Sequence, residues 1–280
     1  MNLKNKTYYL YRVKFTRDHQ KEIFDDGASA SEILSESIIS KPSVKLNRGG
    51  EWRLANLTEV GTDGGYFVVG RISKSKADKF DFSKELFFED EDYQGPFARV
   101  YFNKKLGIIA IEDKSKVNSR VDATADRVKK LLLSTNAVKN RKVRCEVEEI
   151  RDPEGFVRQV LSCDKVLGFS SHFTGPNPID ADQYFQKPLE VYADLMKASQ
   201  GKIQVQGPNL DKKMVVAAAR TSASTANGAS ARIQKGSVKK TIPLQKIKTS
   251  FHSTDHDSTE TYNLMMERYD QVRYAEDNNK

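Results

Sequence analysis

The sequence is poor in cysteine, histidine and tryptophan, and each scarcity excludes a class of protein. Its 280 residues include two cysteines, four histidines and one tryptophan. Two cysteines, Cys145 and Cys163, cannot form a disulfide scaffold and fit a reducing cytosol, so we expect both as small buried side chains. Gly-rich phosphate-binding loops of the familiar spacings are also missing. We therefore predict no bound cofactor.

The chain also lacks long hydrophobic runs. None approaches the roughly 20 residues that span a bilayer, and the residues before the first expected strand lack the apolar core of a signal peptide. With 38% hydrophobic and 30% charged residues, the composition is that of a globular protein able to bury a core. We expect a cytoplasmic protein without membrane contact.

Charge is distributed unevenly along the chain, whose formal net charge is +8. Residues 201–250 hold ten basic residues and one acidic residue, which gives +9 for this segment alone. Residues 251–280 hold three basic and seven acidic residues, which gives −4. The rest of the chain is close to neutral. This asymmetry indicates a basic surface for an anionic partner, followed by an acidic C-terminal helix.

The most apolar stretch is 97–112, where two apolar runs flank a polar turn containing Asn103 and Gly107. This pattern predicts a β-hairpin. The second run, 107–111, is apolar on both faces, as expected for an interior strand of a sheet that is covered on both sides. We expect the hairpin at the centre of the fold.

Strands and helices are expected from different periodicities. Alternating or aromatic runs predict strands over 6–16, 51–60, 66–72, 142–149 and 165–173. Helical spacing predicts helices over 122–135 and from about residue 258 onward.

These elements predict an α+β fold, with an N-terminal antiparallel β-meander packed with a C-terminal half of mixed helices and strands. We expect a β-rich domain over 1–118. The second domain, 119–280, would hold the basic segment 202–248 and the acidic C-terminal helix.

Three further segments carry alternative interpretations. The acidic and aromatic strip 80–93 is expected to be a surface connection, with a protein-binding strip or a nucleic-acid mimic as the alternative. Small polar residues at 221–231 predict a flexible loop. The last helix, 258–275, has an apolar stripe that includes Tyr262, Met265 and Tyr269; we expect it in the core, with a dimer or partner contact as the alternative.

A metal site is not predicted. His252 and His256 are four residues apart, with Asp255 and Asp257 nearby. Zinc sites need three or four ligands, and no third ligand lies on a predicted helix with this pair. We expect a solvated flank of the last helix instead.

One triplet suggests catalysis. Glu112-x-Lys114 closes the hairpin and resembles half of the motif of the PD-(D/E)xK nucleases, in which acidic residues hold Mg²⁺ and the lysine polarises the scissile phosphate. The companion aspartate should lie at an earlier strand end, where Asp92 is a loose candidate. A Mg²⁺-dependent nuclease is therefore the alternative to a protein without catalytic residues.

The basic segment is the strongest functional signal. Several cations on one surface release counterions from a phosphate backbone, which gives sequence-independent, salt-sensitive binding. Few aromatic residues are interleaved, so base stacking on single strands is less supported and duplex DNA is favoured. The residues predicted to contact phosphates are Lys212, Lys213, Arg220, Arg232, Lys235, Lys239, Lys240, Lys246 and Lys248.

Three local patterns carry a resemblance to a family. They are the Tyr-rich opening strand, Tyr-Phe-Val-Val at 66–69 followed by Ser-Lys-Ser-Lys at 73–76, and Phe-Ala-Arg at 97–99 leading into the hairpin. With its size, the chain resembles the RexA-type phage-exclusion proteins of lambdoid prophages. The resemblance implies a two-domain homodimer that binds DNA without strong sequence preference and acts in abortive infection. The segment 221–231 and the acidic C-terminal helix lie outside it.

Three functions are thus distinguished. The first is a non-enzymatic DNA-binding protein of bacterial or prophage antiviral defence. The second is a nuclease that uses Glu112 and Lys114. The third is a protein-interaction module that binds a partner through 80–93 or 258–275.

Overall fold

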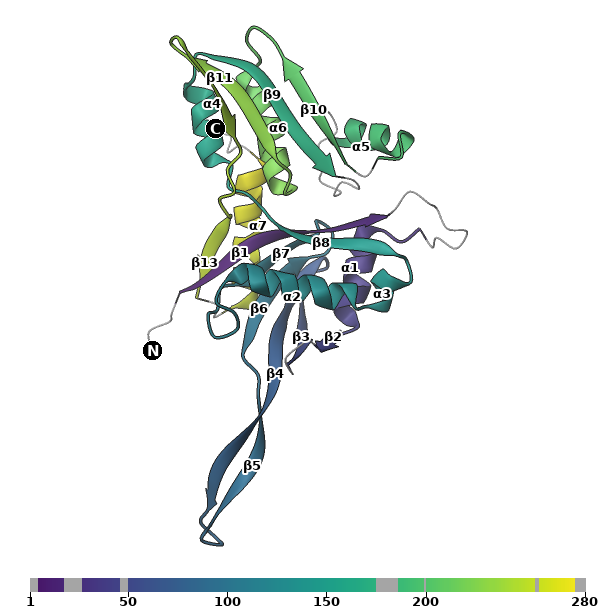
Figure 1. Ribbon diagram of the computed structural model, residues 1–280, viewed down its shortest axis with the longest axis vertical. Helices are drawn as coiled ribbons and strands as arrows, with labels where there is room; N and C mark the ends of the chain where they lie inside the picture. The colour runs from purple at the N-terminus through teal and green to yellow at the C-terminus, as the bar shows by residue number, and fades with distance from the viewer. Residues whose placement is uncertain are drawn as a thin grey trace.

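The computed structural model contains two antiparallel sheets with helices packed on them (Figure 1). It describes residues 5–17, 27–45, 50–174, 186–198, 200–254 and 257–274. Strands and helices together identify the protein as α+β, as predicted. None of the helices in these ranges is long and apolar enough to cross a membrane.

The first sheet has the strand order β13-β1-β7-β6-β4-β3-β2, with β8 added to β1 and β5 added to β4. Its strands are β1 (Lys6–Arg17), β2 (Ser43–Lys45), β3 (Glu51–Val60), β4 (Gly64–Asp81), β5 (Leu86–Gln94), β6 (Phe97–Asn103), β7 (Ile108–Glu112), β8 (Val143–Glu149) and β13 (Ser250–Ser253). Its helices are α1 (Ala30–Ile39), α2 (Val121–Leu133), α3 (Asn136–Lys139) and α7 (Ser258–Arg273).

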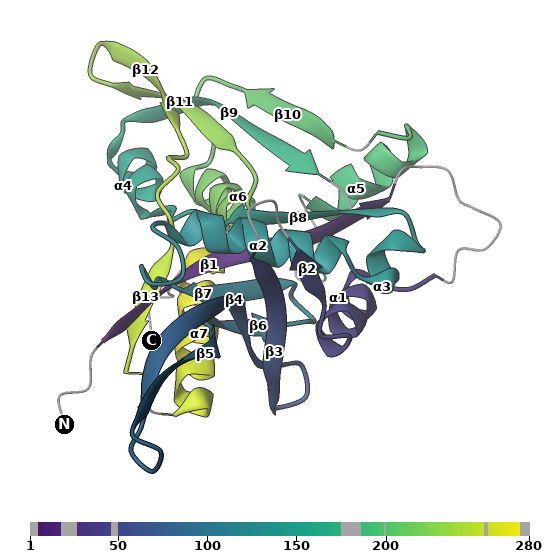
Figure 2. The ribbon, with the colours of Figure 1, turned by 60° about the horizontal axis from the view of Figure 1, so that its bottom comes forward.

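The second sheet has the order β10-β9-β11-β12. It is formed by β9 (Lys165–Thr174), β10 (Gln200–Gln206), β11 (Ala229–Lys235) and β12 (Val238–Pro243), together with α4 (Glu154–Ser162), α5 (Gln186–Leu195) and α6 (Lys212–Ser224). Figure 2 shows this sheet above the first one, with β12 at its edge.

The hairpin predicted at 97–112 is confirmed as β6 and β7. Every residue of β7 is buried. Ile108 and Ala110 belong to the core that includes α4, α6 and α7, whereas Ile109 and Ile111 belong to the core beneath α1, α2 and α3. The four apolar residues of β7 thus make it an interior strand covered on both faces, as its sequence indicated.

The division between the sheets does not coincide with the boundary expected at residue 118. The chain after β7 returns to the first sheet, because α2 packs on it and β8 pairs with β1 over Tyr11–Arg17. It leaves for the second sheet after Ile150 and returns as β13, which pairs with β1 over Lys6–Tyr9. The second sheet is thus an insertion between two strands of the first.

Both cysteines are buried, as expected. Cys145 on β8 lies in the core beneath α2, and its burial raises the pKa of the thiol to about 12. It therefore behaves as an apolar side chain rather than as a nucleophile.

A long two-stranded arm extends from the first sheet, formed by the outer part of β4 and by β5 (Figure 1). Ion pairs along its shaft join Lys74 to Glu91 at 3.0 Å and Lys76 to Glu89 at 2.8 Å. At its tip Phe82 and Phe87 are 87% and 80% exposed. The segment 80–93, expected as a surface connection, is exposed but forms the outer part of a two-stranded hairpin.

The apolar stripe of the last helix is part of the core, as expected. Met265, Tyr269 and Val272 of α7 are at most 1% exposed and pack with residues of both sheets. This face of the segment 258–275 is therefore occupied within the chain. A partner contact, the alternative interpretation of this segment, would therefore have to use the other faces of the helix.

One fully buried cation joins the two sheets. The guanidinium of Arg12 on β1 donates to the Ser224 carbonyl at 3.0 and 2.8 Å, to the Tyr269 hydroxyl at 2.6 Å and to the carbonyl of Leu106. It thereby links the first sheet, the end of α6 and α7.

Replacing Arg12 by Met should destabilise the protein by about 3 kcal/mol, because two carbonyls and a hydroxyl lose their donor in a buried site. Urea unfolding followed by circular dichroism measures this. The control Arg53→Met removes a 55% exposed guanidinium and should leave the midpoint near that of the wild type. An Arg12→Met midpoint equal to the wild-type one would contradict the role of Arg12.

Candidate nucleic-acid interface

The two faces of the second sheet differ in polarity. Val166, Phe169, Ala231, Ile233 and Ile242 lie on its inner face and pack against α4 and α6 in one core. The polar residues between them along the strands point to the opposite, outer face. Because successive side chains of a strand alternate between faces, the sequence of each strand separates an apolar side from a polar side.

The outer face is basic and contains no acid. The four strands of the second sheet contain no Asp or Glu at any position. The cations on the outer face are Lys165, Lys202, Arg232 and Lys239, each of them exposed, and His172 is an exposed polar neighbour. The charged side chains of this exposed face are thus all positive. Elsewhere in the molecule, cations are repeatedly paired with acids.

The strand register spreads these cations over the face. Lys202 is opposite His172 on β9, Arg232 is opposite Gly168, and Lys165 and Lys239 are both opposite Gln234. With about 3.4 Å per residue along β9, the row of Lys202 and the row of Lys239 lie about 24 Å apart. The cations are therefore spread along the length of the face.

The outer face has no aromatic residue on its four strands; its remaining side chains are mainly Ser, Gln and Thr. Ser170 and Ser230 hydrogen-bond to each other at 2.9 Å across β9 and β11. Without rings on which bases stack, this face supports contacts to phosphates rather than to unpaired bases.

Four of the nine predicted phosphate-binding residues are exposed but lie elsewhere. Lys240 is next to Lys239, yet it points to the helix side, where its Nζ donates to Gln159 of α4 at 3.2 Å. Lys235 lies at the end of the β11–β12 hairpin, Lys213 in the first turn of α6, and Lys246 after β12. Only Arg232 and Lys239 of the nine belong to the outer face.

Three more of the predicted residues are engaged within the protein. Arg220 is 7% exposed; its guanidinium binds Glu154 at 2.8 Å and the Gln271 carbonyl at 2.8 Å. Lys212 donates to the carbonyls of Leu161 and Cys163, and Lys248 is paired with Asp122. These three cations hold the fold together, so we leave them out of the interface.

Sequence reasoning missed Lys165, Lys202 and His172 as site residues. The signal that identifies them is the alternation within each strand, since Lys202, Gln204 and Gln206 alternate with Gly201, Ile203 and Val205. Counting charge along the chain selected the segment 202–248, which contains Lys202, Arg232 and Lys239 but not Lys165. The assignment of charge to a face of the sheet required the strand register.

The segment 221–231, predicted as a flexible loop, is instead ordered and buried. Thr221 to Ser224 end α6, and Ala229 begins β11. The small hydroxyl side chains are paired, as in the 2.7 Å hydrogen bond between Ser171 and Ser222. Small residues here allow α6 to approach β9 closely, which a count of loop-forming residues does not reveal.

The nuclease alternative gains no support from the placement of Glu112 and Lys114. Glu112 is 4% exposed; it accepts the Arg99 backbone N–H at 2.9 Å and lies 3.6 Å from Lys6. Lys114 lies over the Phe97 ring at 4.4 Å. The side chain of Asp92 and all of His256 lie outside the described residues.

Within the described ranges, His, Cys, Asp and Glu form no group of three that would hold a metal ion. His252 lies on β13, where its Nδ1 is 3.2 Å from the Thr7 hydroxyl.

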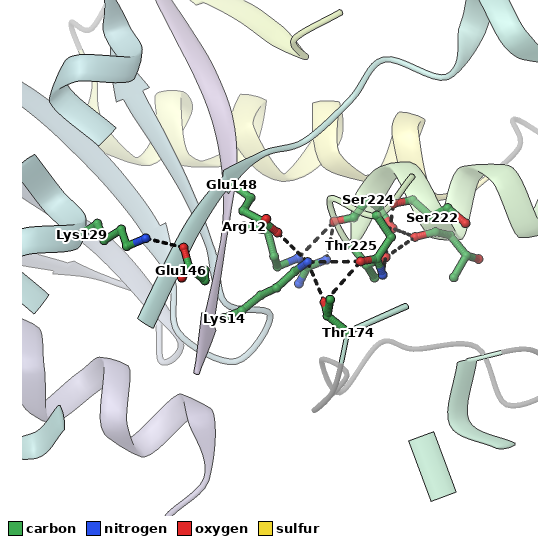
Figure 3. A network of polar contacts seen from close by, with 11 residues as sticks. Arg12, Lys14, Lys129, Glu146, Glu148, Thr174, Ser222, Ser224 and Thr225 are labelled. Atoms are coloured by element: carbon green, nitrogen blue, oxygen red, sulfur yellow. Dashed lines mark hydrogen bonds and ion pairs between the residues drawn. The ribbon is translucent and has the colours of Figure 1, made fainter. Parts of the chain in front are cut away.

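A polar network fixes the lower end of the second sheet against β1 and β8 (Figure 3). Lys14 is 7% exposed, and its Nζ donates to Glu148 at 2.7 Å, to Thr174 at 3.1 Å and to Asn227 at 3.3 Å. Burial lowers the pKa of Lys14, an effect that Glu148 opposes. The network holds the outer face at one fixed position beside β8.

Comparison with models of protein families finds no match to this chain, and comparison with curated proteins finds no significant match. The fold and surface therefore define the class: an α+β protein with two antiparallel sheets, of which the second presents an open basic face.

The lowered pKa of Lys14 predicts a pH dependence. Between that pKa and the ordinary value of 10.5, the unfolded chain binds a proton that the folded chain does not, so the free energy of unfolding rises with pH. The free energy of unfolding of the wild type minus that of Lys14→Met should therefore rise as pH approaches 10.5. Glu146 raises the pKa of Lys129. The corresponding difference in the free energy of unfolding for Lys129→Met should therefore fall as pH rises. If the free energy of unfolding of the wild type minus that of Lys14→Met falls with pH instead, the burial of Lys14 is contradicted.

Proposed function

We propose that this protein binds nucleic acid, with duplex DNA favoured, through the outer face of the second sheet and without catalysis. The observation that carries the proposal is a four-stranded sheet without a single acidic residue, whose exposed face presents Lys165, Lys202, Arg232 and Lys239. Helices α4 and α6 cover only the inner face. Such a surface binds phosphates irrespective of base sequence.

The expected salt dependence follows from the number of cations. Each phosphate that a cation neutralises contributes about −0.9 to the slope of log affinity against log salt concentration. Four cations on the outer face thus predict a slope of about −3.6 for duplex DNA. A role in phage exclusion would follow from the family resemblance alone, and binding of this kind is compatible with it.

The pair Lys239 and Lys240 provides a matched test, because the two lysines are adjacent but lie on opposite faces of β12. Lys239→Gln should weaken duplex DNA binding about tenfold near physiological salt and make the salt slope shallower by about 0.9, since one phosphate contact is lost. Lys240→Gln should change both quantities much less. Fluorescence anisotropy over a salt series with Mg²⁺ and without measures both.

Equal effects of the two substitutions would exclude the outer face as the interface. Cleavage of the DNA in the presence of Mg²⁺, lost on Glu112→Gln, would instead support the nuclease alternative. Binding that is absent even at low salt would favour the protein-interaction module.

Protein binding through the tip of the arm is a second candidate function. Phe80 lies 5.0 Å from Phe82 and 4.7 Å from Phe87 between ring centroids, so the tip is a preformed aromatic cluster. Large exposed aromatic side chains are rare on surfaces without a partner and are typical of the centres of interfaces. The ion-paired shaft holds this cluster far from the rest of the protein (Figure 1).

A photo-crosslinking amino acid in place of Phe82 should give discrete protein adducts in living host cells, because the tip would be buried in a partner. The same amino acid at Lys76, on the ion-paired shaft, is the control and should give far fewer. Absence of adducts from position 82, with the arm intact by circular dichroism, would argue against the tip as a binding element.

A further inference from the structure

The two edges of the second sheet differ in how they are protected. β10 and β12 are its edge strands, and among the strands of the described ranges only β9 pairs with β10. β12 contains Lys239, Lys240 and Pro243, which are residue types that keep an edge strand from pairing with another chain. β10, with the sequence Gln-Gly-Lys-Ile-Gln-Val-Gln, has one charge and no proline. Its sequence therefore leaves the edge open to a further strand.

The backbone groups at the open edge of β10 belong to its even-numbered residues. The Gly207 N–H donates to the Leu167 carbonyl of β9 at 3.2 Å. The direction of backbone N–H and C=O groups alternates along an antiparallel strand, so residues 201, 203 and 205 also direct these groups to β9. Lys202, Gln204 and the other even-numbered residues direct theirs to the open edge.

This alternation restricts how a second β10 can pair with the first. Even-numbered residues of one strand must be opposite even-numbered residues of the other, because only these offer backbone groups at the edge. Odd-numbered residues are then opposite odd-numbered ones. Directly opposite residues of an antiparallel pair point to the same face. The apolar sides of the two strands therefore coincide, and so do their basic sides.

The sequence of β10 favours one register, centred on Ile203. This residue is the midpoint of Gln200–Gln206, so only this register pairs the strand over its full length. It places Ile203 opposite its own copy and Lys202 opposite Gln204. A register centred on Lys202 would instead place two like charges directly opposite each other, which is destabilising.

Gly201 supplies a packing contact in this register. A Cβ built on Gly201 would lie 2.3 Å from Cζ of Phe173, so the Phe173 ring covers this glycine on the apolar side of the sheet. In the register centred on Ile203, Val205 of one strand is opposite Gly201 of the other. The branched side chain would then lie beside the aromatic ring, a type of cross-strand contact that stabilises sheets.

Large apolar side chains are exposed next to the open edge. Val205, on the apolar side of β10, is 44% exposed. α5 lies beside the start of β10 (Figures 1 and 2), and Val191, Tyr192, Leu195 and Met196 in and just after it are at least 60% exposed. In an antiparallel pair the end of one β10 lies beside the start of the other. A second copy would therefore approach this apolar cluster, whose exposure is typical of interfaces.

We propose that β10 pairs with β10 of a second copy of this chain, antiparallel and centred on Ile203. The two four-stranded sheets then form one continuous sheet, with a twofold axis through the pair of Ile203 residues. Such a contact is isologous and closes after two copies. Both outer faces lie on the same side, so the basic surfaces of the two copies adjoin. The proposal concerns assembly and does not depend on nucleic-acid binding.

The first test measures the oligomeric state of the full chain by sedimentation velocity. The wild type should sediment as a dimer. Gln204→Pro removes a backbone N–H that points to the open edge and none that bonds to β9, so it should give a folded monomer. Gln204→Ala keeps this N–H and is the matched control, which should remain a dimer.

A second test examines the register through disulfide formation. Opposite residues of a non-hydrogen-bonded antiparallel pair have Cα atoms about 4.5 Å apart, which is within the range that a disulfide spans. Ile203→Cys, opposite its own copy, should therefore form a covalent dimer on mild oxidation. Gln204→Cys, opposite Lys202, should not. Both native cysteines are buried, so the wild type gives the background.

Two results would overturn the proposal. One is a wild type that sediments as a monomer over the whole concentration range of the experiment. The other is a dimer that persists in Gln204→Pro and is not cross-linked preferentially through Ile203→Cys. If circular dichroism shows that Gln204→Pro does not fold, the two cysteine variants decide, and equal cross-linking at both positions excludes the pairing centred on Ile203.

Discussion

The arrangement of the two sheets depends on the burial of one guanidinium. Arg12 is fully buried on β1 and is satisfied by carbonyl and hydroxyl oxygens from the β6–β7 turn, the end of α6 and α7. A buried charge is tolerated only where its donors find acceptors, so these three elements must meet at one point. Their meeting places the inserted second sheet against the first.

This junction explains why one face of the second sheet stays open. The inner face is covered by α4 and α6, and the lower end of β9 is fixed to β1 through Lys14 and Thr174. The chain thus covers the apolar side of the sheet and leaves the basic side exposed. The acidic arm lies at the opposite end of the molecule (Figure 1), and Glu89, Asp90 and Glu91 of its shaft are paired with its own lysines.

Local pattern predicted the elements better than it predicted their partners. The buried strand β7 and the stripe of α7 were found because apolar residues recur at the spacing of their own element. The arm and the order at 221–231 were missed because they depend on cross-strand ion pairs and on the contact of Ser222 with Ser171. Local pattern also does not show that β8 and β13 pair with β1, a strand far away in sequence.

The candidate site illustrates the same limit: charge counting selected the segment, whereas only the strand register separated Lys239 from Lys240.

The most direct test of the proposed interface is acetylation of lysines with and without duplex DNA, with each site quantified by mass spectrometry. Protection of Lys165, Lys202 and Lys239, with Lys240 and Lys76 still modified, is the result we predict. Equal protection of Lys239 and Lys240, or protection confined to lysines outside the second sheet, would contradict an interface on its outer face.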